Sequence, residues 1–151
     1  MKTSLILFLI SISSLVLAQE MYVFQQYNSN FTVSVGEDVG SYVRAGQQML
    51  FEDSKSNRFE CVRLGKVINY KTDLESGNYR TVGLHSVVYE SNKHNIYVDK
   101  EGDHYILSCG DASTIVSKMG ASFVVELVPG ITEEIVYKFG IVLVYHLLDG
   151  A

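Results

Sequence analysis

The chain of 151 residues has no tryptophan, a single proline, Pro129, and two cysteines, Cys61 and Cys109. The missing tryptophan argues against an immunoglobulin-like sandwich, which buries one between its cysteines. It also argues against a lipocalin-like carrier, because the Gly-x-Trp signature of that class requires a tryptophan. With one proline and no low-complexity stretch, the sequence contains no segment typical of a linker between domains.

Basic residues are in deficit, since 12 Lys and Arg face 17 Asp and Glu and give a net charge of −5. Neither the acidic nor the basic residues are clustered in runs. A nucleic-acid-binding domain normally carries a basic excess, so nucleic acid is not expected as a partner. The sequence also shows no basic patch for anionic lipid. We therefore expect a neutral or cationic partner, or one held by specific contacts.

The N-terminus reads MKTSLILFLISISSLVLAQ, with Lys2 before an apolar stretch and the triplet Val16-Leu17-Ala18 at its end. This order is typical of a secretory signal peptide. We therefore expect residues 1–18 to be a signal peptide and residues 19–151 to be one secreted, extracellular domain.

At the other end, an apolar run from Phe139 to Leu148 has about half of the roughly 20 residues that a membrane-spanning helix requires. The mature chain is thus expected to lack a membrane span. The run is interpreted as a β-strand that is apolar on both faces and must be covered twice. Its second face needs the opposite sheet or another subunit, which favours a homo-oligomer.

Between the two ends the pattern is β throughout, with no helical period. Short runs rich in Val, Ile, Tyr, Phe and Thr begin at Met21, Phe31, Gln48, Arg58, Lys66, Thr81, Asn95, His104, Ser113 and Ala121. Glycine- and asparagine-containing turns separate them. About ten strands in one domain predict a single antiparallel sandwich or barrel.

Two segments carry a resemblance to a known family. Residues 112–130, ASTIVSKMGASFVVELVPG, and 138–146, KFGIVLVYH, resemble the closing strands of complement component one-q globular heads, whose fold tumour necrosis factor-like ligands share. Residues 58–74 take the place of the family's central strand but lack its Pro-Gly-x-Tyr-x-Phe core. No collagen-like stalk is present. The resemblance implies an all-β, ten-strand jelly-roll sandwich, a trimer around an apolar axis, and recognition through surface loops.

Cys61 and Cys109 would lie in an oxidising compartment, so the sequence predicts one disulfide between them, with two free or intermolecular thiols as the alternative. The triplet Asn30-Phe31-Thr32 is an N-glycosylation acceptor, expected at the start of a strand.

No nucleophile motif such as G-x-S-x-G is present, and no enzyme activity or cofactor is expected. The DKEGD stretch offers Asp99, Glu101 and Asp103 as candidate calcium ligands, but the twelfth position of the loop is Gly110 instead of glutamate, so a hairpin turn is the competing interpretation.

The ten tyrosines supply the candidate binding residues, because four of them lie near loops: Tyr79, Tyr89, Tyr97 and Tyr105. The leading hypothesis is a secreted recognition module of the complement type that binds carbohydrate or protein through surface loops in innate defence. The alternative is a lipocalin-like carrier of a small hydrophobic ligand.

Overall fold

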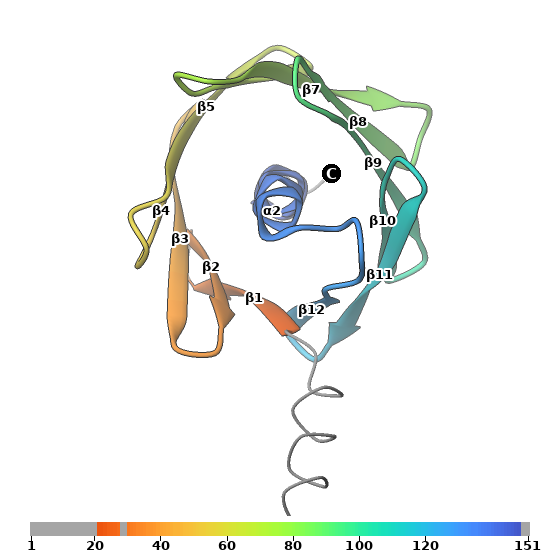
Figure 1. The fold of residues 1–151 in the computed structure, drawn as a ribbon. Helices are drawn as coiled ribbons and strands as arrows, with labels where there is room; N and C mark the ends of the chain where they lie inside the picture. The colour runs from red at the N-terminus through yellow and green to blue at the C-terminus, as the bar shows by residue number, and fades with distance from the viewer. Residues whose placement is uncertain (1–20, 28–29, 149–151) are drawn as a thin grey trace, which may run out of the picture.

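The computed structural model describes residues 21–27 and 30–148. Twelve antiparallel strands, each paired with its neighbours in the sequence, form one sheet that closes because the first strand pairs with the last. The strands are β1 (Met21–Tyr27), β2 (Asn30–Val35), β3 (Asp38–Ala45), β4 (Gln48–Asp53), β5 (Arg58–Leu64), β6 (Val67–Lys71), β7 (Ser76–Val82), β8 (Ser86–Ser91), β9 (Asn95–Glu101), β10 (His104–Cys109), β11 (Ala112–Met119) and β12 (Ser122–Glu126). Figure 1 looks along the barrel and shows the closed ring.

Short turns that contain glycine connect the strands in this up-and-down order. Six two-residue turns begin with a glycine at positive φ while the second residue keeps negative φ, which is the type II′ hairpin geometry. These glycines are Gly36, Gly46, Gly65, Gly102, Gly110 and Gly120. Because II′ turns match the twist of antiparallel strands, each hairpin forms locally and the sheet curves into a barrel.

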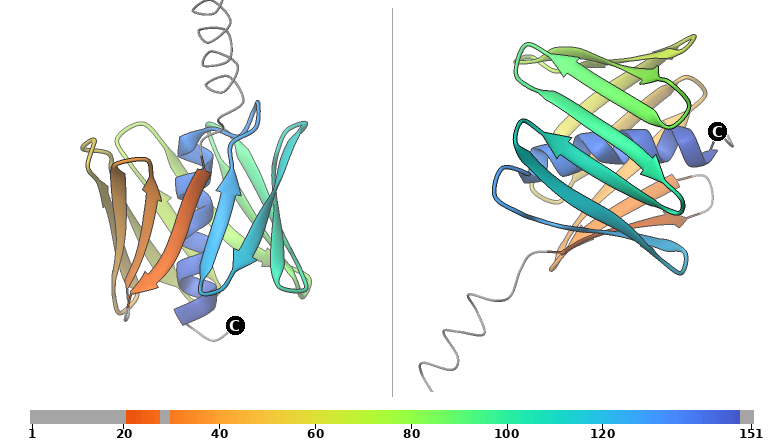
Figure 2. Two further views of the ribbon diagram at one scale, coloured as in Figure 1. Left: turned by 90° about the horizontal axis from the view of Figure 1, so that it is seen from below. Right: turned by 90° about the vertical axis from the view of Figure 1, so that its right-hand side faces the viewer.

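In the described part of the chain one helix, α2 (Glu133–Leu148), fills the space that the strands enclose. Figure 2 shows it running along the inside of the barrel between the two ends. Inward-facing side chains of the strands, many of them Tyr and Phe, pack against it in one core. From Ile135 to Tyr145 every residue of the helix is buried. A helix that is apolar on all sides is stable only in such an interior.

Tyrosines of the barrel wall hydrogen-bond the backbone of α2. The hydroxyl of Tyr42 donates to the carbonyl oxygen of Tyr137 at 2.6 Å, and that of Tyr79 donates to the carbonyl oxygen of Lys138 at 2.9 Å. Gly140 allows this close approach, because a Cβ atom there would overlap the Tyr42 hydroxyl and lie 2.7 Å from the Phe24 ring. The tyrosines satisfy their buried hydroxyls while they fix the helix within the barrel.

The jelly-roll sandwich expected from the sequence is wrong, because the sheet closes on itself as a barrel of twelve strands. The tail that was interpreted as a strand is the helix α2. Its apolar surface is covered on all sides, as expected, but by the barrel of its own chain. From Phe139 to Tyr145 the tail is buried and offers no face to a second subunit. The homo-oligomer, with the trimer implied by the resemblance, stays a prediction.

The predicted disulfide is absent from the structure, in which Cys61 and Cys109 are free. Cys61 lies on β5 and Cys109 on β10, and strands β6 to β9 separate them in the barrel wall. Asn30 is the first residue of β2, the place expected for the glycosylation acceptor, whose modification stays a prediction. The predicted signal peptide, residues 1–18, lies outside the described residues.

Replacing Gly140 with alanine tests how tightly α2 fits the barrel. In an exposed helix this change would stabilise by about 1 kcal/mol. Here the new methyl group would overlap the Tyr42 ring, so we expect a net loss of about 1–3 kcal/mol of unfolding free energy. Urea denaturation at neutral pH measures it, and a stabilised variant would contradict the packing described.

Candidate functional site

The candidate site lies at the end of the barrel where α2 begins. Thr132 precedes the helix, and its hydroxyl accepts the backbone N–H of Ile135 at 3.5 Å, as a capping residue does. Glu133 and Glu134 occupy the first turn, where the helix dipole favours negative charge. The turns β4–β5, β6–β7 and β8–β9 surround this end. Polar side chains from all of them reach the start of the helix.

A buried ion pair sits inside this end of the barrel. The ammonium of Lys138, on α2, lies 2.6 Å and 2.7 Å from the two carboxylate oxygens of Glu75, which precedes β7. The side chains of both residues are almost completely buried, at 1% and 3% exposure. The hydroxyl of Tyr89 also donates to Glu75. An isolated charge would be very costly here, so each group depends on the other.

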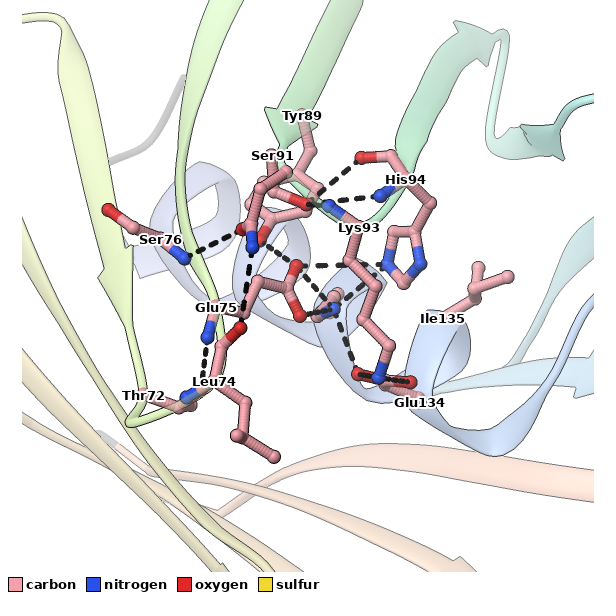
Figure 3. Close-up of polar contacts among 12 residues, drawn as sticks. Thr72, Leu74, Glu75, Ser76, Tyr89, Ser91, Lys93, His94, Glu134 and Ile135 are labelled. Atoms are coloured by element: carbon pink, nitrogen blue, oxygen red, sulfur yellow. Dashed lines mark hydrogen bonds and ion pairs between the residues drawn. The ribbon is translucent and has the colours of Figure 1, made fainter.

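Two further residues complete the cluster shown in Figure 3. The Lys138 ammonium lies 3.2 Å from the Glu134 carboxylate and 2.8 Å from Nε2 of His94, in the β8–β9 turn. An ammonium has three protons and can only donate. Its three partners are therefore Glu75, Glu134 and His94, and Nε2 of His94 must accept. The imidazole is neutral in this arrangement, with its proton on Nδ1.

The cluster shifts the pKa of its acids and of its base. Burial would raise the pKa of Glu75, but the hydrogen bonds from Lys138 and Tyr89 outweigh it, and that pKa is lowered. Hydrogen bonds from Lys93 and Lys138 likewise overcome burial and lower the pKa of Glu134. Burial, followed by the charge of Lys138, lowers the pKa of His94. Both acids are thus held ionised and the histidine neutral.

A surface cleft of about 260 Å³ opens beside the cluster. Its lining combines aromatic rings with polar and charged side chains: Asn57, Arg58, Phe59, Tyr70, Lys93, Glu133, Glu134 and Tyr137. The rings of Phe59 and Tyr70 lie with centroids 5.2 Å apart and are nearly buried. The floor of the cleft is therefore largely fixed by the core, while its polar rim faces solvent.

Ion pairs arrange the rim of the cleft. Lys93 binds the Glu134 carboxylate at 2.8 Å, and Lys55 binds the Glu133 carboxylate at 2.6 Å. Because Glu134 also accepts from Lys138, one wall of the cleft belongs to the buried cluster. Cluster and cleft thus form one connected polar site.

The four tyrosines predicted as binding residues are placed differently from one another. Tyr79, Tyr89 and Tyr105 are buried, with 1–2% of each exposed, and Tyr89 belongs to the cluster. Tyr97 is 47% exposed on the outer wall, away from the cleft lining. A contact role for these residues stays a prediction.

The candidate calcium ligands lie around the β9–β10 turn, at the opposite end of the barrel. Asp99 accepts a hydrogen bond from the hydroxyl of Ser86, while Glu101 and Asp103 approach His104 at 3.7 Å and 3.9 Å. Among the described residues, no group of three or more potential ligands gathers to hold a metal ion. Calcium binding stays a prediction.

Sequence reasoning missed the residues that meet at the mouth of the barrel. In the sequence, His94 is one histidine near a turn and Glu75 is one residue of a turn, and neither stands out as a site residue. Lys138 carried the one usable signal, because it is a lone charge directly before a long apolar run. A lysine so placed, once enclosed, requires a buried carboxylate partner.

No protein-family model matches the chain, and neither the curated proteins nor the solved structures give a match. Within the described part of the chain, no helix combines the length and apolar character needed to cross a membrane. The site must therefore be interpreted from its own geometry.

Removing the buried cation should destabilise the barrel strongly. In Lys138→Met, Glu75 would remain buried without its partner, so we expect a loss of about 3–5 kcal/mol. Urea denaturation at neutral pH checks this. The double variant Glu75→Gln/Lys138→Met removes both charges and should recover part of the loss. A single variant as stable as the parent would show that the pair contributes little.

The lowered pKa values of Glu75 and Glu134 predict acid sensitivity with a definite sign. Their stabilising contribution is complete above their ordinary pKa of 4.5 and is lost as the pH falls through the lowered values. Unfolding free energy measured against pH should therefore fall in this acid range. In Lys138→Met the same limb should be shallower, because Lys138 is the main cause that lowers the pKa of Glu75 and a further cause for Glu134. An equally steep limb would contradict this origin.

Proposed function

We propose that the chain is a secreted recognition module that binds a small, neutral, hydroxyl-rich ligand, of the carbohydrate class, in the cleft at the mouth of the barrel. The observation that carries the proposal is the composition of that cleft. An aromatic floor lies beneath a rim in which two carboxylates, two cationic groups and one amide converge.

The rim suits a ligand rich in hydroxyl groups. Each hydroxyl both donates and accepts, so it can use the carboxylates of Glu133 and Glu134 as acceptors and Arg58, Lys93 and Asn57 as donors. The two charges of each sign balance, so the cleft favours neither an anion nor a cation. The aromatic floor offers an apolar surface to the C–H groups of a sugar ring. The cleft volume fits a ligand of one or two sugar units better than an extended chain.

The position of α2 disfavours the alternative of a carrier that holds an apolar ligand in its lumen. Phe139, Leu143 and Val144 of the helix are fully buried in the centre of the barrel. The space that such a carrier gives to its ligand is occupied by the protein itself. Recognition at the surface is therefore the function that we develop.

Binding to an array of oligosaccharides tests the proposal. We expect selective binding of neutral glycans and about tenfold weaker binding by Asn57→Ala and by Arg58→Ala, since each loses one ligand hydrogen bond of about 1.4 kcal/mol. Arg58 is well exposed, so its removal should leave the fold intact.

The matched control is Arg80→Ala. This arginine is also exposed and paired with a glutamate, Glu90, but it lies outside the cleft lining. Its variant should bind as the parent does. Absence of selective binding, or equal binding by all three variants, would overturn the proposal.

A further inference from the structure

We propose that His94 is a proton-operated latch on the cleft, which holds the β8–β9 turn against α2 when the imidazole is neutral and releases the turn and the bound ligand when it is protonated. The release of ligand rests on the proposed function. The movement of the turn does not, and can be measured without any ligand.

The latch is a single contact between the turn and the helix interior. Within the turn, the backbone N–H groups of Lys93 and His94 donate to the hydroxyl of Ser91, and the Ser91 N–H donates to the carbonyl oxygen of His94. Asn92 ties the turn to the neighbouring β6–β7 turn. Among the described contacts to α2, His94 reaches the buried Lys138 and Lys93 reaches the half-buried Glu134.

Protonation reverses the sign of the buried contact. An imidazolium has no acceptor nitrogen, so the hydrogen bond from Lys138 is lost and two cations face each other 2.8 Å apart. Glu75 lies 4.0 Å from Nε2 of His94, but its oxygens already accept from Lys138 and Tyr89. It can neutralise the imidazolium only by giving up part of its bond to Lys138. Moving the turn outward into water is the alternative that keeps the buried ion pair.

The groups that face His94 fix the pH range of the latch. They are Lys138 and Glu134 from α2, Glu75 from the β6–β7 turn, Lys93 from its own turn and the Tyr89 ring from β8. Burial raises the pKa of Tyr89, so its hydroxyl stays neutral over this range. The two glutamates, with lowered pKa values, stay ionised until the pH falls below 4.5. Release is therefore expected below 6.5, the ordinary pKa of histidine, and before the carboxylates titrate.

The cleft would respond directly to this movement. Lys93 adjoins His94 in the sequence and lines the cleft, so an outward shift of the turn withdraws its ammonium. Glu134 then loses its partner in the rim and keeps only Lys138. The rim then loses the balance of positive and negative groups that suits a neutral ligand.

The test compares the parent chain with His94→Gln by NMR between about pH 7 and pH 5, the range in which histidine titrates. Glutamine can accept from Lys138 through its amide oxygen but carries no titrating proton. In the parent we expect His94 to show the Nδ1–H tautomer at neutral pH. On acidification, the amide proton of Ser76, which donates to Asn92 of the moving turn, should lose at least tenfold in exchange protection. In His94→Gln this loss should be absent. His104→Gln, at the opposite end of the barrel, is the matched control and should behave as the parent does.

Each result bears on a different statement. Protection that falls equally in parent and His94→Gln would overturn the latch, as would a parent whose Ser76 amide stays protected after His94 is protonated. If neutral glycans bind, affinity should fall about tenfold from pH 7 to pH 5 in the parent and stay constant in His94→Gln. Affinity that falls equally in both would also overturn it. If no glycan binds at any pH while the turn still opens, the proposed function fails and the latch stands.

Discussion

Complete enclosure of α2 is the constraint on which the rest of the structure depends. The helix is buried on every side, so one sheet packed against one face could not stabilise it. A closed barrel of twelve strands gives a lumen wide enough for a helix with its side chains. The wall tyrosines follow from the same constraint, because they span the distance to the helix and bond its backbone carbonyls.

The polar site follows from an exception to that apolar interior. Lys138 lies one turn inside the helix, where its side chain is buried, and Glu75, His94 and Glu134 gather around it as its polar partners. A buried ion pair of this kind adds little net stability compared with apolar packing. It does fix how the turns at the barrel mouth meet the helix. The protein groups that bind the buried cation therefore also determine how the cleft is arranged.

The sequence predicted the all-β class and most of the strands, but it could not predict how the sheet closes. Alternating apolar residues located β1 and β2, since their inward side chains repeat every second position. The predicted runs omit β3 and most of β7, because Gly40 and Gly77 are of the residue type that is typical of turns. Both glycines instead admit close neighbours, the Phe51 ring and the Tyr89 hydroxyl.

The predictions for the C-terminal tail and for the functional site failed for a different reason. A uniformly apolar run has no period that distinguishes a helix from a strand, and only the presence of a lumen decides it. The site depends on residues from turns that lie far apart in the sequence, such as Glu75, His94 and Glu134, so no local pattern could reveal it.

The closure of the barrel also determines the order in which the chain can fold. Phe24 pairs with Phe123, so β1 keeps an open edge until β12 has formed, and α2 follows later still. The hairpins can form locally, but closure of the ring requires this one pairing between the two ends of the sheet and should be the slow step. Until then an open, apolar sheet is exposed to aggregation.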